Sequence, residues 1–198
     1  MEARKRPEYV LEILVDPIYV ADIVRGILHT IFFHRYFPSM RPSSLDVLDL
    51  TLPVVADPEL QTLIETRVGQ LVRQLSSTSS PSGGSRGELG VRFFEKRRRK
   101  GGLGGWLTST ARGEEEVCWE VWKLKFTLTT PRTETERTAL LRAEAPALQK
   151  TAMTIVKIVN RDKDHIPPIT TSEMNPFPYE ILLNPRAESD AKTTGFFA

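Results

Sequence analysis

The side chains best suited to nucleophilic or metal chemistry are one cysteine and three histidines, Cys118, His29, His34 and His165. His29 and His34 are five residues apart, so on a helix they point about 140° apart. They therefore cannot share a metal ion as an i, i+4 pair does. Cys118 follows the glutamates at 114–116, which would raise the pKa of its thiol and lower its reactivity. The hypothesis of an enzyme that uses Cys118 or a histidine ranks well below the leading one. We expect no catalysis, no cofactor and no metal site.

The glycine-rich segment KGGLGGWLTST, residues 100–110, is a second candidate for function. A phosphate-binding loop needs a Lys-Ser or Lys-Thr pair and a helix start after its glycines, and both are missing here. Burying Trp106 in the core would contribute on the order of 2–3 kcal/mol. Holding about ten loop residues still would cost several times more. A tryptophan on a loop held by a rigid scaffold is typical of a binding hot spot, so the residues favour partner binding.

A basic run precedes this segment and consists of Lys96, Arg97, Arg98, Arg99 and Lys100. Three interpretations remain open: a nuclear-import patch, a contact with phosphate or anionic lipid, and a solvated loop edge. The net charge of +2 requires neither nucleic acid nor membrane as a partner. A basic-patch module that binds anionic membrane or nucleic acid is therefore the alternative function, and its affinity would fall steeply with salt.

Composition places the chain among ordinary globular proteins, since 40% of its 198 residues are hydrophobic and 26% are charged. A single cysteine allows no internal disulfide, which suits a reducing compartment. The N-terminal stretch is too charged for a signal peptide, and no window approaches the roughly 20 apolar residues of a membrane span. We expect a cytosolic or nuclear protein.

Hydrophobic periodicity predicts an α+β fold, with helices on one face of a largely antiparallel sheet. On 121–130, Trp122 and Leu124 share one face while Lys123 and Lys125 share the other, as in a sheet with one solvated face. The expected strands cover residues 8–15, 45–52, 88–96, 121–130 and 179–183. Three helices are expected, and their start signals are Asp16-Pro17, Asp57-Pro58 and the capping box Thr133-x-x-Glu136. The third helix is expected to be kinked or to restart at Pro146.

These elements predict a single domain over residues 1–186. Two segments, 76–87 and 98–116, are expected to be mobile loops, and 187–198 is expected to be a disordered tail. The second of these segments contains Trp106, which places this residue near the tip of a long hairpin loop.

Several segments together resemble the autophagy-related protein 101 family of HORMA-domain proteins. They are VLEILVD leading into ILHTIFFHR, VRFFEKRRRK, CWEVWKLKFTL, and TETER leading into MTIVKIVNRDKDHIP. The resemblance covers roughly residues 9–183. It implies a HORMA-like fold, in which three helices pack on a mainly antiparallel sheet and an extended C-terminal region follows, and it implies no catalysis.

The same resemblance implies a function. Family members are subunits of the autophagy-initiation kinase complex at the cytoplasmic preautophagosomal structure, where they form a heterodimer with the HORMA domain of autophagy-related protein 13 and stabilise it. Many carry an exposed loop with Trp and Phe, the WF finger, which recruits downstream autophagy factors. Trp106 matches the tryptophan of the finger, and Leu107 stands where phenylalanine is expected. The leading hypothesis is thus a non-catalytic adaptor that presents Trp106 and Leu107.

Overall fold

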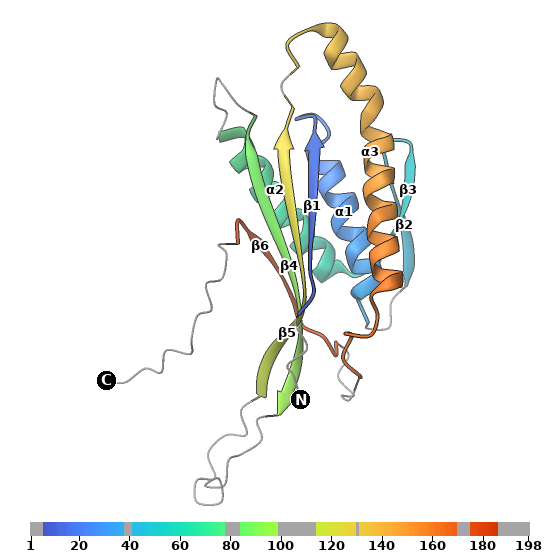
Figure 1. Cartoon of the computed structure of the whole chain (residues 1–198), viewed down its shortest axis with the longest axis vertical. Coiled ribbons are helices and arrows are strands. Elements are labelled where there is room, and N and C mark those ends of the chain that lie inside the picture. Colours follow the sequence, from blue (N-terminus) through green and yellow to red (C-terminus); the bar gives the residue numbers. More distant parts are fainter. Residues whose placement is uncertain are drawn as a thin grey trace, which may run out of the picture.

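A mixed four-stranded sheet, in the order β1-β5-β4-β6, forms one layer of the described structure (Figure 1). This computed structural model describes residues 6–37, 41–77, 84–98, 114–129, 131–169 and 175–185. The strands are β1 (Glu8–Val15), β4 (Arg86–Arg98), β5 (Glu114–Leu128) and β6 (Tyr179–Leu183). β4 pairs antiparallel with both β5 and β6, whereas β1 runs parallel to β5. The sheet is therefore mainly antiparallel, with one parallel pair at an edge.

Three helices in the described part of the chain cover one face of this sheet (Figure 1). They are α1 (Val20–Arg35), α2 (Pro58–Ser77) and α3 (Glu134–Arg161). Because the helices lie on one face and the best strands alternate, the predicted α+β class is confirmed.

The helix starts follow two of the three predicted signals. Asp57 accepts a hydrogen bond from the Leu60 N–H at 2.8 Å, and Thr133 accepts one from the Glu136 N–H at 3.1 Å. The prediction for Asp16 was wrong, because α1 begins only at Val20. Asp16 instead accepts the Ile18 N–H at 2.8 Å and so closes a turn before the helix.

Pro146 lies inside one continuous helix, so α3 does not restart there. Figure 1 shows the first turns of α3 leaning away from the axis of the remainder. A proline removes one intrahelical hydrogen bond and crowds the preceding turn, which accounts for a bend at this place.

The predicted strand at 45–52 was wrong, because the structure has a hairpin there. Its strands are β2 (Pro42–Val47) and β3 (Leu50–Val55), paired antiparallel. The chain turns at Leu48, whose φ of 53° lies in the left-handed region that most residues avoid. Because a leucine occupies this position rather than the usual glycine or asparagine, the sequence contains no recognisable hairpin signal.

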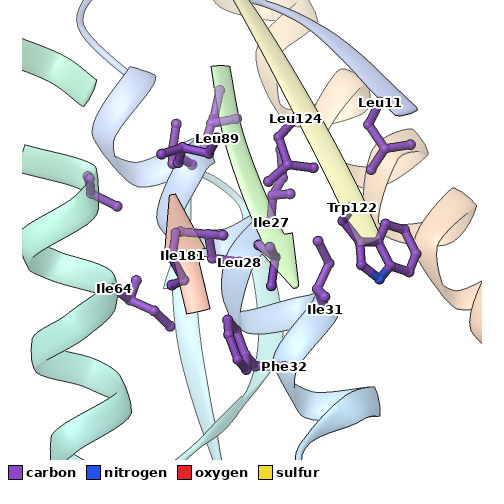
Figure 2. Close-up of a cluster of buried hydrophobic side chains, with 14 of the residues drawn as sticks. Leu11, Ile27, Leu28, Ile31, Phe32, Ile64, Leu89, Trp122, Leu124 and Ile181 are labelled. Atoms are coloured by element: carbon purple, nitrogen blue, oxygen red, sulfur yellow. The ribbon is translucent and has the colours of Figure 1, made fainter. Parts of the chain in front are cut away.

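The core lies between the helices and the inward face of the sheet (Figure 2). α1 is central, since residues all around it are buried. Figure 2 shows side chains from several elements converging there: Leu11, Ile27, Leu28, Ile31, Phe32, Ile64, Leu89, Trp122, Leu124 and Ile181. This core holds the strands rigidly in place.

The segments predicted to be loops are described only at their ends. Residues 76 and 77 complete α2, and 86 and 87 begin β4. In the second segment, Arg98 is the last residue of β4 and 114–116 begin β5. Strands β4 and β5 therefore reach further than the predicted strands at 88–96 and 121–130. Residues 99–113 and the tail 187–198 lie outside the described residues.

Candidate partner-binding site

The two longest strands continue beyond the four-stranded sheet as a pair. β6 leaves β4 at Phe93, and β1 leaves β5 at Val121. The remaining part, Phe94–Arg98 paired with Glu114–Cys118, is a two-stranded segment that we call the β4–β5 ribbon. Figure 1 shows it projecting from one end of the sheet. At about 3.4 Å per residue it extends roughly 15 Å.

A β-bulge marks the root of this ribbon. The register shifts between Phe93, which faces Glu120, and Phe94, which faces Cys118, so Trp119 is the extra residue. The Trp119 side chain is buried, and its ring centroid lies 5.3 Å from that of Phe177 and 5.6 Å from that of Phe93. Such aromatic packing fixes the direction in which the ribbon leaves the domain.

Opposite charges face each other along the ribbon. The register pairs Lys96 with Glu116 and Arg97 with Glu115. Directly opposed charges of unlike sign contribute roughly 0.2–1 kcal/mol per pair. Arg97 also forms an ion pair with Glu95. The described part of the predicted basic patch is therefore matched by an acidic strand, whereas Arg99 and Lys100 lie outside the described residues.

Trp106 and Leu107 also lie outside the described residues. The structure nevertheless describes the two ends from which their segment departs. Residues 99–113 leave β4 after Arg98 and enter β5 at Glu114, and these two residues are register partners at the far end of the ribbon. The segment that carries Trp106 thus begins and ends at the ribbon tip.

On the sheet side of the bulge, next to the root of the ribbon, lies a buried polar cluster that the sequence analysis did not predict. Glu120 is fully buried and its carboxylate accepts hydrogen bonds from Arg35 Nε at 2.9 and 3.0 Å. Trp122 Nε1 donates to it at 2.6 Å, and His165 Nε2 lies 2.7 Å from Glu120 Oε2. The cluster joins β5, the end of α1 and the chain after α3. Because its charges are paired and hydrogen-bonded, their burial is tolerated.

Asp162 extends this cluster toward β1. Its backbone oxygen accepts a hydrogen bond from Arg35 Nη2 at 3.1 Å, and its carboxylate accepts one from the Tyr9 hydroxyl at 3.0 Å. The neighbouring Arg161 guanidinium, with Tyr9, lowers the pKa of Asp162 to about 2. Burial and the bond to Asp162 raise the pKa of Tyr9.

One signal could have revealed this cluster. Glu120 lies two residues before Trp122 and four before Leu124, so it shares the strand phase that faces the core. A carboxylate in a buried phase requires a cationic or hydrogen-bonding partner. The sequence does not say which one, because Arg35 and His165 are distant from Glu120 along the chain.

The residues considered for chemistry are dispersed. Cys118 lies at the ribbon root, His29 is buried on α1, and His165 belongs to the Glu120 cluster. Burial raises the pKa of the Cys118 thiol, as predicted in direction, but the cause is desolvation and not the acidic neighbours. Burial also lowers the pKa values of His29 and His34. Within the described ranges, no group of His, Cys, Asp and Glu could hold a metal ion.

The sequence model of the autophagy-related protein 101 family matches residues 12–173. The chain belongs to this family. Autophagy-related protein 101 of Schizosaccharomyces pombe is 26% identical over 173 residues, covering 87% of this chain and 84% of its own. The Arabidopsis thaliana protein is 23% identical over 196 residues, which cover 90% of this chain and 86% of that protein. The Homo sapiens protein is 24% identical over 177 residues, which cover 82% of this chain and 75% of that protein.

Membership of the autophagy-related protein 101 family confirms the resemblance seen in the sequence and the HORMA fold expected from it. The family is non-catalytic, and membership implies a subunit of the autophagy-initiation complex. Of the segments that carry the resemblance, those with Arg35, Glu120 and His165 meet in the buried cluster. No helix among the described residues is long and apolar enough to span a membrane.

Proposed function

We propose that this chain is an adaptor that pairs with the HORMA domain of autophagy-related protein 13, stabilises it, and presents Trp106 and Leu107 to downstream autophagy factors. It would act in the cytoplasm at the preautophagosomal structure, within the autophagy-initiation kinase complex. Family membership supports the setting. The ribbon supports the mode of action, because it departs from a rigid core and ends at the segment that carries Trp106.

The observation that carries the proposal is the projection of β4 and β5 beyond both of their neighbours. Residues near the ribbon tip are separated from the domain core by roughly 15 Å of paired strand. We infer that a bulky aromatic residue in the segment attached at this tip contributes little to the fold and is available to a partner. The bulge at Trp119 and the unlike charges along the ribbon give this projection a defined direction.

The alternative, a basic patch that binds anionic membrane or nucleic acid, has weaker support. Two of its five cationic residues, Lys96 and Arg97, are each opposite a glutamate in the register. Neighbouring carboxylates reduce the positive potential available to a polyanion. The ribbon is therefore a better support for its tip than a surface for phosphates.

The test is the substitution Trp106→Ala, with Leu103→Ala as a control in the same segment. We expect Trp106→Ala to leave the melting temperature and the pull-down of the HORMA domain of autophagy-related protein 13 unchanged. It should reduce recruitment of downstream factors and autophagosome formation, whereas Leu103→Ala should change neither. A large loss of thermal stability would place the indole in the core. Normal recruitment by a stable Trp106→Ala protein would remove the presenting role.

A further inference from the structure

β1 is the edge strand at the right of the sheet in Figure 1. Its register with β5 runs from Glu8 to Val15 without a shift, so the edge is free of bulges. Proteins commonly protect such edges with bulges, prolines or lysines, because unpaired backbone groups are a template for another strand. Between Glu8 and Val15 there is no bulge, proline or lysine, and the charged residues of this edge are two glutamates, Glu8 and Glu12.

The hydrogen-bond phase shows which backbone groups face outward. The Val121 N–H donates to Pro7 O at 3.1 Å, and the Thr129 N–H donates to Val15 O at 2.9 Å. In a parallel ladder every second residue bonds to a given neighbour, so the odd-numbered residues of β1 face β5. The N–H and C=O groups of Glu8, Val10, Glu12 and Leu14 therefore point away from the sheet, and they pair with no strand among the described residues.

The outward-pointing backbone groups of β1 end at the carboxyl end of the strand, where the next donor already has a partner. The next even-numbered residue is Asp16, and its N–H donates to Glu144 Oε1 of α3 at 2.7 Å. The carboxylate thus satisfies the outward donor that follows Leu14. The open edge therefore extends from Glu8 to Leu14, a length suited to one short added strand.

The side chains of the same four residues define the chemistry of this edge. Val10 is 46% exposed and Leu14 is 68% exposed, while the two glutamates are exposed between and beside them. Glu8 forms an ion pair with Lys123 at 2.6 Å. Glu12 lies opposite Lys125 in the register and forms no ion pair among the described residues. Along the solvent-facing side, acidic and apolar positions therefore alternate.

This pattern discriminates between occupants. Two copies of β1 joined edge to edge would bring four glutamates together, which disfavours a second copy of the chain. A strand with basic residues opposite the glutamates and apolar residues opposite Val10 and Leu14 would instead match both the charge and the apolar surface.

We propose that the β1 edge binds an extended segment of a partner protein as a fifth strand. On one face, this segment carries basic and apolar residues in alternation, as in Lys-x-Val-x-Lys-x-Val. The proposal goes beyond the adaptor role and does not depend on Trp106, because β1 lies at the opposite side of β5 from β4.

The probe for the test is the synthetic peptide Lys-Thr-Val-Thr-Lys-Thr-Val, and the matched control is Glu-Thr-Val-Thr-Glu-Thr-Val. Both are titrated into the full chain at low salt while amide hydrogen exchange is followed. We expect the lysine peptide to slow exchange at Val10, Glu12 and Leu14 and to bind at least tenfold more tightly than the control. Absence of protection at millimolar peptide, or equal binding of the two peptides, would overturn the proposal.

Two variants and a modified peptide sharpen the result. Val10→Pro removes one outward N–H and is tolerated on an edge strand, so it should abolish binding in a folded protein. Glu12→Lys leaves Glu8 as the one acidic residue of this edge, so it should abolish the preference for the lysine peptide. Since Val10→Pro could disturb the strand itself, a lysine peptide N-methylated at alternate amides on its pairing edge provides an independent measurement. Full binding of that peptide would contradict backbone pairing.

Discussion

Arg35 and Glu120 form a buried ion pair at 2.9 Å, with side chains that are 3% and 0% exposed. The pair connects the last residue of α1 with the root of the β4–β5 ribbon. A buried pair is weak evidence of net stabilisation, yet breaking one is costly because the remaining charge is left without compensation. The position of the ribbon therefore depends on this contact.

Replacing Glu120 with Gln is expected to lower the free energy of unfolding by about 3–5 kcal/mol, because Arg35 then stays buried without a counter-charge. Chemical denaturation measures this loss. The control is Glu65→Gln, which breaks the partly exposed pair with Arg25 and should cost at most about 1 kcal/mol. Equal losses in the two variants would show that the Glu120 cluster is not a structural centre.

Asp162 predicts a pH dependence of stability. Its pKa is lowered to about 2 in the folded protein, mainly by Arg161, so the ionised form is favoured by folding. The contribution is fully present above the usual aspartate pKa of about 4 and is lost as the pH falls toward 2. The difference in unfolding free energy between the natural protein and Asp162→Asn should shrink over that window. A difference that is constant from pH 6 to pH 2 would contradict the assigned ion pair.

The charges along the ribbon can be tested by exchanging them. Replacing Glu115 and Glu116 with Lys places like charges opposite Arg97 and Lys96, so amide exchange in the ribbon should become faster. Adding Lys96→Glu and Arg97→Glu restores unlike pairs in the reverse sense and should restore protection. If the fourfold variant exchanges as fast as the double variant, the ribbon is not held by cross-strand charge.

Binding to anionic vesicles tests the alternative function. Binding to vesicles rich in phosphatidylserine is expected to be negligible for the natural protein at 150 mM salt. Strong, salt-sensitive vesicle binding that is lost on replacing Arg99 and Lys100 would favour the basic-patch hypothesis over the adaptor.

The predictable part of the structure came from local patterns. Periodicity indicated α1, α2 and β5, and the capping signals at Asp57 and Thr133 are confirmed by their hydrogen bonds. The β2–β3 hairpin was missed because Leu48 adopts a left-handed conformation that is unusual for leucine. The parallel pairing of β1 with β5 is equally invisible locally, since it joins segments more than a hundred residues apart.

The candidate site was also predictable only in its locally encoded part. Trp106 attracted attention through its glycine-rich neighbours, and the basic run through its charge. The register places Lys96 opposite Glu116 and Arg97 opposite Glu115. Local patterns could not predict this pairing, because the bulge at Trp119 shifts the register by one residue. The only feature of the local sequence that indicated the buried cluster at the ribbon root was Glu120, a charged residue in a core-facing position of its strand.

Tryptophan fluorescence tests the central claim most directly, because the chain has three tryptophans and two of them, Trp119 and Trp122, are buried. If Trp106 is held away from the core for a partner, iodide should quench a large part of the emission of the isolated chain. Trp106→Phe should abolish that quenchable part and leave the melting temperature unchanged. Emission that iodide cannot reach in the natural protein, together with a large fall in melting temperature for Trp106→Phe, would contradict the account.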